Sequence, residues 1–180
     1  AADGSGGIWA GTVRGLGHLS FGPHGEPRTA TWRRDAGLPA DWVWALLRSR
    51  RGELWVGTEE GLSRQLPSGR FATMTTADGL AGNYVVSLFE DRSGALWVGA
   101  IDGLSRIRLD AAGRPFEVRN FREADGLSMQ RSYDIAEDAA GRLFKQVPYD
   151  HSYPHCWRCE TALIYYAKSS WYLRTSELRE

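Results

Sequence analysis

Two cysteines near the carboxyl end have the spacing of half a zinc site. Cys156 and Cys159 form a Cys-x-x-Cys pair, and His151 and His155 lie just before it. A tetrahedral structural zinc site needs four ligands, and the chain contains only these two cysteines. Three readings stay open: a pair without metal, which we favour, a zinc site completed by the histidines, and a redox-active pair.

Composition excludes several classes of protein. Lys plus Arg and Asp plus Glu both number 22 in 180 residues, and 42% of the residues are hydrophobic. This balance favours a globular core and gives no basic excess for binding nucleic acid or an anionic membrane. We expect no membrane-spanning segment, because no apolar run is long enough. No phosphate-binding loop, catalytic triad or pair of carboxylates stands out, so we expect no enzymatic activity.

A repeat organises residues 1–144. The motif Gly-x-apolar-Trp begins at Gly6, Gly52 and Gly94, and a fourth copy at Gly141 ends in Phe144 instead of Trp. The spacings are 46, 42 and 47 residues. Two further motifs keep the same order at the same period, with Gly-Leu at 15–16, 61–62 and 103–104 and again at 37–38, 79–80 and 126–127. Such a period indicates a solenoid, a propeller or another repeated array.

Each repeat unit contains short segments that are typical of β-strands. Segments 85–91, 96–100, 103–109 and 116–121 are apolar, β-branched or aromatic, and turns containing Gly or Asp separate them. Asp91 to Gly94 fits a tight turn, with an Asp that binds backbone amides and a Gly that accepts a positive φ. Four strands in every 40–45 residues or so predict a β-propeller blade. The fold class is therefore all-β, a partial propeller of about three four-stranded blades with a non-propeller tail, and its tryptophans are expected to pack in the core.

The repeat resembles a known family. Segments 40–65 and 83–107 are similar to the two-component regulator propeller repeat. The resemblance implies the sensor region of a hybrid histidine kinase, usually periplasmic and often detecting glycans. It also implies further blades as partners, while the strand pattern itself names no ligand.

The sequence changes character after residue 144. Segments 151–159 and 167–172 resemble isoleucyl-tRNA synthetase, a cytoplasmic enzyme. This resemblance implies that Trp171 lies near an aminoacyl pocket and that Cys156 and Cys159 form half of a zinc site whose other cysteines are absent. Neither ATP-binding signature of that enzyme occurs in the chain.

Two domains and three functions are suggested by this division. We expect propeller repeats over 1–144 and a synthetase-like fragment over 145–180, joined near 139–145, where Gly-Arg-Leu-Phe fits both patterns. The leading hypothesis is a non-catalytic piece of a sensor propeller, chimeric with the synthetase fragment. The alternative functions are a fragment of isoleucyl-tRNA synthetase and a propeller enzyme. The alternative to a chimera is a propeller with a divergent C-terminal extension.

Overall fold

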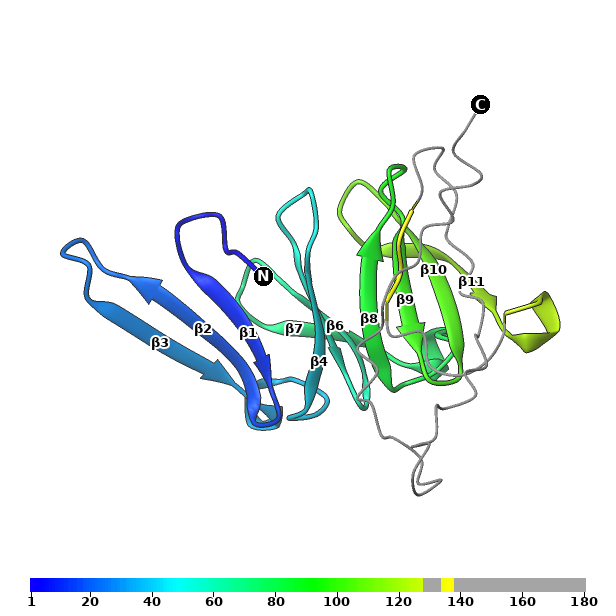
Figure 1. The fold of residues 1–180 in the computed structure, drawn as a ribbon, viewed down its shortest axis with the longest axis horizontal. Helices are drawn as coiled ribbons and strands as arrows, with labels where there is room; N and C mark the ends of the chain where they lie inside the picture. The colour runs from blue at the N-terminus through cyan, green and yellow to red at the C-terminus, as the bar shows by residue number, and fades with distance from the viewer. Residues whose placement is uncertain (128–133, 138–180) are drawn as a thin grey trace, which may run out of the picture. The chain divides into compact units, whose positions relative to one another are not determined.

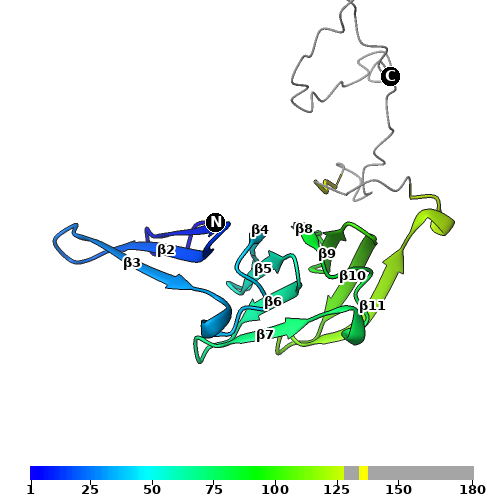
Figure 2. The ribbon, with the colours of Figure 1, turned by 90° about the horizontal axis from the view of Figure 1, so that it is seen from below.

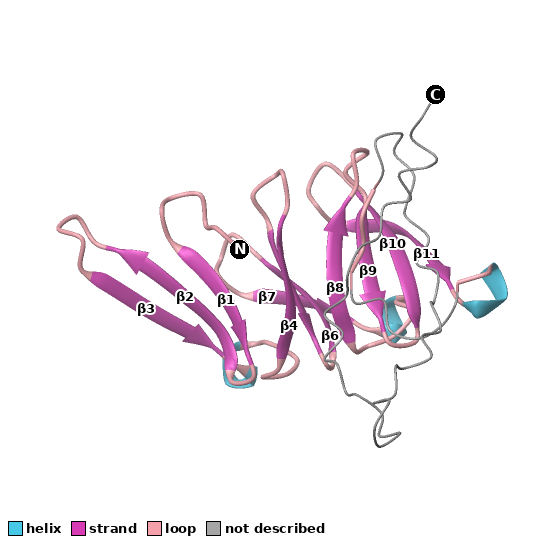
Figure 3. Ribbon diagram, in the orientation of Figure 1, coloured by secondary structure: helices cyan, strands magenta, loops and turns pink. Residues whose placement is uncertain are grey.

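The chain folds into consecutive antiparallel sheets. A computed structural model describes residues 1–127 and 134–137, and its secondary structure consists of strands and short 3₁₀ turns. The sheets succeed one another in chain order, as Figures 1 and 2 show from two directions. Figure 3 shows that tight loops connect the strands within each sheet. The all-β prediction is confirmed.

The strands fall into three sheets of three, four and four members. The first sheet contains β1 (Ile8–Thr12), β2 (Gly15–Phe21) and β3 (Pro27–Trp32). The second contains β4 (Val43–Arg48), β5 (Leu54–Thr58), β6 (Gly61–Gln65) and β7 (Phe71–Met74). The third contains β8 (Val85–Glu90), β9 (Leu96–Ala100), β10 (Gly103–Leu109) and β11 (Pro115–Phe121). Within each sheet, neighbours in sequence are neighbours in space, which is the meander of a propeller blade. We call the three sheets blades 1, 2 and 3 in chain order.

The repeat places equivalent residues on equivalent strands. Trp55 lies on β5 and pairs with Arg64, while Trp97 lies on β9 and pairs with Arg106. Both tryptophans are therefore on the second strand of their blades, as the motif spacing predicts.

The first sheet differs from the predicted four-stranded blade. Trp9 lies on β1, so β1 corresponds to β5 and β9 and not to the innermost strand of its blade. Beside β1, Ala2 forms an isolated bridge to Ile8, and the Ala1 amino group donates to the Trp9 carbonyl oxygen at 2.8 Å. The prediction of about three four-stranded blades therefore holds for blades 2 and 3, whereas blade 1 has three strands.

The first turn of each blade has the expected chemistry. In blade 3, the Asp91 and Gly94 amides donate to the carbonyl oxygens of Ala95 and Asp91 at 3.0 and 2.9 Å, and the φ of Gly94 is 82°. The corresponding turn of blade 2 begins at Ser49 and has the same backbone bonds, with a φ of 84° at Gly52. Positive φ at these glycines explains why this motif requires Gly.

The second Gly-Leu motif ends a one-turn 3₁₀ helix between blades. These helices are η1 (Arg34–Ala36), η2 (Thr76–Asp78) and η3 (Glu123–Asp125). Each is followed by a left-handed Gly, and in the first two cases by a Leu that is 2% exposed. The motif thus redirects the chain and anchors it to the core.

The core lies between blades. One cluster joins Trp9 and Leu16 of blade 1 to Val43, Leu54 and Val56 of blade 2. A second joins blade 2 to blade 3, and it contains Trp55, Leu62, Leu80, Val85, Leu96, Val98 and Ile107. Blades 1 and 2 therefore present their Trp to the following blade, blades 2 and 3 present Leu and Val to the preceding one, and Leu-Trp-Val is buried in both β5 and β9.

A glycine permits close packing at each blade junction. A Cβ on Gly57 would lie 2.6 Å from Val85 Cγ1, and a Cβ on Gly11 would lie 2.7 Å from Val43 Cγ1. No real Cβ tolerates such contacts, so this glycine lets the innermost strand of the next blade approach.

Candidate functional site

A polar cluster surrounds the motif tryptophan of blade 3. The Trp97 Nε1–H donates to Asp91 Oδ2 at 2.8 Å, and Asp91 Oδ1 accepts from the amides of Ser93 and Ala95. The Arg106 guanidinium lies over the Trp97 ring, with its Cζ 5.6 Å from the ring centroid and its Nε 3.6 Å from Asp91 Oδ2. One carboxylate thus holds the turn, the indole and the arginine together.

The environment of Asp91 keeps it ionised. Burial by itself raises the pKa of the Asp91 carboxyl, but the hydrogen bonds that it accepts and the Arg106 charge outweigh burial, and the pKa lies below its ordinary value of 3.8. The carboxylate is fully engaged with groups of its own blade, which marks it as a structural group rather than a reactive one.

Blades 1 and 2 vary this cluster. In blade 2, Ser49 replaces the aspartate, Arg64 pairs instead with Glu53 at 2.8 Å, and the buried Trp55 Nε1 has no hydrogen-bond partner. In blade 1, Asp3 accepts two backbone bonds, and its Oδ2 lies 2.8 Å from His18 Nε2. The His18 ring in turn stacks on Trp9 with centroids 4.1 Å apart. Each blade therefore covers its tryptophan with a cationic or imidazole side chain.

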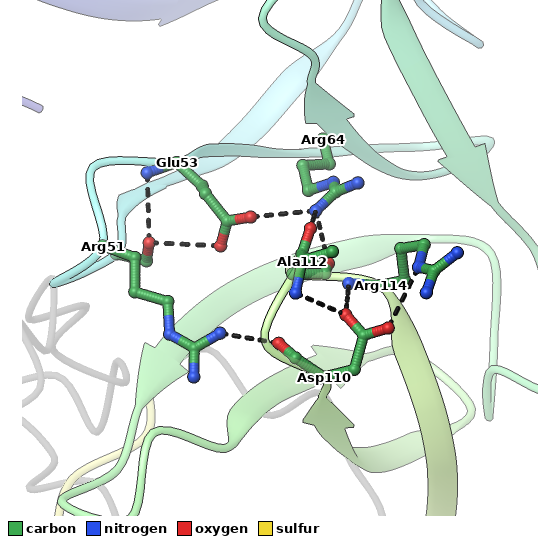
Figure 4. A network of polar contacts seen from close by, with 8 residues as sticks. Arg51, Glu53, Arg64, Asp110, Ala112 and Arg114 are labelled. Atoms are coloured by element: carbon green, nitrogen blue, oxygen red, sulfur yellow. Dashed lines mark hydrogen bonds and ion pairs between the residues drawn. The ribbon is translucent and has the colours of Figure 1, made fainter.

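Arginines of blade 2 hold a turn of blade 3. Arg51 Nη1 donates to the Asp110 carbonyl oxygen at 2.7 Å, and Arg64 Nη1 donates to the Ala112 carbonyl oxygen at 3.1 Å and to that of Gly113 (Figure 4). The Asp110 carboxylate closes the turn by accepting from the amides of Ala112 and Arg114. This network joins two blades by binding backbone oxygens.

A second contact between blades recurs along the chain. The amide of Arg50 donates to Glu90 Oε2 at 2.7 Å, and its guanidinium lies 3.5 Å from Glu90 Oε1. Arg92, at the equivalent position of blade 3, makes the same pair of contacts with Glu137, at 3.1 and 3.8 Å. We call these two pairs the arginine staples. Glu137 thus occupies the place that Glu90 takes at the end of β8, so the repeat geometry continues to residue 137.

An open groove of about 490 Å³ lies beside the arginine network. Its lining includes Arg51, Glu53, Arg64, Leu66 and Pro67. The contacts already made by both guanidinium groups assign them to joining blades, so the groove is not the strongest ligand site.

Three aromatic side chains gather where the inner strands begin. Trp42 and Trp44 are 42% and 48% exposed, and their rings meet edge to face with centroids 5.4 Å apart. Tyr84 lies beside Trp44, with centroids 5.5 Å apart and planes inclined by 43°. We call this group the aromatic cluster.

The local backbone explains why these rings stand at the surface. The register between β4 and β5 shifts between Val43 and Ala45, which leaves Trp44 at a bulge without a partner on β5. Val43 itself packs in the core, so its two neighbours point away from it. Tyr84 occupies in blade 3 the position that Trp42 occupies in blade 2.

Acidic residues occupy the turns that adjoin the strands of the aromatic cluster. Val43 pairs with Thr58, so Glu59 and Glu60 begin the adjoining turn of blade 2. In blade 3, the Ile101 amide donates to the Tyr84 carbonyl oxygen at 3.1 Å, and Asp102 comes next in the chain. The exposed indole rings and the half-buried phenol ring can stack flat against a ring-shaped ligand, while polar groups around them hydrogen-bond to the edge of that ligand.

The residues that the sequence indicated for chemistry lie outside the described part. Cys156, Cys159 and Trp171, together with Phe144 and the segment 145–180, are among residues 138–180. Within residues 1–127 and 134–137, no group of His, Cys, Asp or Glu could hold a metal ion. In the same ranges, no helix is both long and apolar enough to cross a bilayer.

Sequence reasoning missed the aromatic cluster. The prediction that tryptophans pack in the core is correct for Trp9, Trp55 and Trp97 but wrong for Trp42 and Trp44. One available signal was the repeat itself, because Trp44 aligns with Val86 and neither Trp42 nor Trp44 belongs to the Gly-x-apolar-Trp motif.

Comparison with known proteins finds the same repeat and fold. The two component regulator propeller family matches residues 37–60 and 79–102. The extracellular domain of the putative hybrid two component system BT3049 from B. thetaiotaomicron superposes with a TM-score of 0.67 at 19% identity, covering 79% of this chain and 19% of that one. The corresponding domain of BT4673 gives a TM-score of 0.62 at 22% identity. Virginiamycin B lyase from Staphylococcus aureus gives 0.54 at 16% identity, so the fold is also found in an enzyme.

A second set of relatives is unrelated to propellers. The chain is 60% identical over 43 residues to isoleucine–tRNA ligase of Streptomyces coelicolor, and 65% identical over 48 residues to that of Streptomyces avermitilis. The ligase of Thermus thermophilus matches over 68 residues at 44% identity. The chain spans only 4 to 6% of the length of these ligases.

These similarities agree with the blade geometry and with both resemblances seen in the sequence. Residues 37–60 and 79–102 match the two component regulator propeller model, the blades have the fold found in the extracellular domains of two putative hybrid two component systems, and a short stretch is similar to isoleucine–tRNA ligase.

Proposed function

We propose that the propeller repeats are part of a non-catalytic, ligand-sensing propeller of a two-component signalling sensor, and that the aromatic cluster is where it binds its ligand. The observation that carries the proposal is the exposure of Trp42 and Trp44 in a blade whose other tryptophan is 1% exposed. Large aromatic rings left at a surface are costly for a soluble domain unless something covers them.

A carbohydrate suits this surface. The faces of pyranose rings are apolar and stack on indole, while their hydroxyl groups pair with polar side chains such as those of Glu59 and Asp102. The sensor resemblance points to the same class of ligand and to a periplasmic location for the propeller parent. Further blades of that parent are its expected partners.

We propose binding rather than turnover because the carboxyl groups with a lowered pKa serve the fold. The lowered pKa values of Asp3, Glu26, Asp91 and Asp110 come with hydrogen bonds to backbone or side chains of their own blades. None of these groups belongs to the aromatic cluster. Similarity to virginiamycin B lyase concerns the fold alone.

The test is a titration of the full chain with neutral mono- and disaccharides, measured by tryptophan fluorescence and calorimetry. Trp44→Ala should weaken binding by about tenfold, since a stacked aromatic ring contributes about 1–1.5 kcal/mol. Phe116→Ala is the matched control, because Phe116 is 59% exposed on β11 and is not part of the aromatic cluster. Equal affinities of wild type and Trp44→Ala would overturn the proposal.

The ligase similarity supports a second proposal about the remaining chain. We propose that 145–180 is a synthetase-derived fragment of cytoplasmic origin joined to the repeats near 139–145, and that Cys156, Cys159 and Trp171 have lost their partners there. The fragment should support no isoleucine-dependent ATP–pyrophosphate exchange. Continuous long DNA reads across codons 135–150 would show that the junction is genomic, and their absence would make it an assembly error.

A further inference from the structure

The aromatic cluster has an uneven electrostatic environment. Glu59 and Asp102 lie in the turns that adjoin the strands of the cluster, and their side chains form no hydrogen bond or ion pair within the described residues. Glu59 comes directly after Thr58, the partner of Val43, which lies between the two tryptophans. Asp102 comes directly after Ile101, whose amide binds the Tyr84 carbonyl oxygen.

Three arginines at this edge of the blades make side-chain contacts, whereas Arg14, in the equivalent turn of blade 1, makes none among the described residues. Arg34 pairs with Glu60 through Nη2, and the Arg34 amide donates to Asp41 Oδ1 at 2.9 Å. Arg33 Nε donates to the Arg14 carbonyl oxygen at 3.0 Å, and Arg122 Nη2 to the Ala81 carbonyl oxygen at 3.1 Å. In the turns of blades 2 and 3 that adjoin the aromatic cluster, the unpaired charges are therefore those of Glu59 and Asp102, whereas the unpaired Arg14 belongs to the turn of blade 1.

The aromatic rings also favour a positively charged ligand. The faces of Trp and Tyr are negative because of the ring quadrupole, and a cation above them is attracted. The protein already uses this contact internally, where the Arg64 and Arg106 guanidinium groups lie 5.9 and 5.6 Å from the centres of Trp55 and Trp97. No such cation covers Trp42, Trp44 or Tyr84 among the described residues.

We infer that the aromatic cluster selects a saccharide carrying a positively charged amino group, with the sugar ring stacked on an exposed indole and the ammonium group directed to Glu59 or Asp102. The inference rests on the proposed function, whose ligand class it narrows. An anionic sugar would meet both carboxylates and the negative ring faces, and this arrangement opposes its binding.

The experiment compares ligands that share one ring. Glucosamine, N-acetylglucosamine, glucose and glucuronate are titrated into the full chain at slightly acidic pH, where the amino group is protonated. Glucosamine should bind about threefold to tenfold more tightly than glucose, as expected for a partly exposed cation–π or ion-pair contact. N-acetylglucosamine should lose that advantage, glucuronate should bind most weakly, and added salt should reduce the differences.

Variants separate charge from stacking. Glu59→Gln combined with Asp102→Asn should abolish the preference for glucosamine while leaving glucose affinity within about twofold, because the rings remain. Glu117→Gln is the control, since Glu117 lies on β11 and pairs with Arg108. Equal binding of glucose and glucosamine, or tightest binding of glucuronate, would overturn this inference and leave the proposed function intact. Absence of Trp44-dependent binding for all of these sugars would overturn both.

Discussion

At the scale of single residues, Asp91 connects three parts of blade 3. It closes a turn, accepts from the buried Trp97 indole and faces Arg106. Blade 2 lacks this carboxylate, and there the Trp55 Nε1 is buried without a partner. The repeat therefore tolerates loss of this bond but keeps the tryptophan for its packing.

Replacing Asp91 with Asn should lower the free energy of unfolding by about 2 kcal/mol at neutral pH, because charge-assisted hydrogen bonds are lost. The folded-state pKa of Asp91 lies below its ordinary value, so its charged form contributes stability above about pH 5, and this contribution disappears as pH falls through the folded pKa. Urea unfolding across pH should show the difference between wild type and variant shrinking towards acid pH. A constant difference would contradict this role of the charge. Glu117→Gln, at an exposed position, should change stability by less than about 0.5 kcal/mol.

At the scale of elements, the two seams between blades are held differently. Between residues 1–32 and 43–74, no hydrogen bond or ion pair joins the two sheets, and the seam depends on apolar packing. Between blades 2 and 3, the arginine staple and the arginine network add polar contacts. At the first seam Gly4 takes the place of the staple arginine, and Arg48 takes the place of its glutamate.

The staple can be measured by a double-mutant cycle with Arg50→Ala and Glu90→Ala. The Glu90 side chain is only 12% exposed, so we expect a coupling energy of about 0.5–1 kcal/mol, at the upper end for a surface ion pair. The control cycle uses Arg28 and Glu26, whose side chains are 65% and 44% exposed, and should give no measurable coupling. Equal coupling in the two cycles would show that the Arg50 pair is an ordinary surface contact.

The elements could be read from sequence because their signals are local. Predicted segments 85–91 and 103–109 correspond to β8 and β10, since their apolar and β-branched composition and the turn residues around them act within a few positions. The contacts between Arg51 and the Asp110 turn could not be predicted, because they join positions that meet only when blades stack. The aromatic cluster was hidden for a related reason, as the exposure of Trp44 depends on a bulge.

At the scale of the whole molecule, residues 148–180 should be dispensable for the repeats. Their deletion should leave the free energy of unfolding of the propeller part within about 0.5 kcal/mol, because a synthetase-derived segment has no designed partner surface there. Zinc should not raise the melting temperature, since a two-cysteine half-site binds too weakly to shift folding by mass action. The measurements are thermal melts of the full and truncated chains with and without zinc.

A loss of several kcal/mol on truncation would contradict this. Strong stabilisation by zinc that disappears in Cys156→Ser would do so as well. Either result would make the tail an integrated part of the protein and would overturn the junction near 139–145.

The stacking of Trp against Leu and Val gives the row of blades a direction. Trp9 meets Leu54 and Val56, Trp55 meets Leu96 and Val98, and the two faces of a blade are not interchangeable. A blade duplicated in the gene would find a matching face on either side, whereas a blade inserted in reverse would find none. Such a repeat can gain or lose units without redesign of its neighbours, so the number of blades can change in evolution while the chemistry of each seam stays the same.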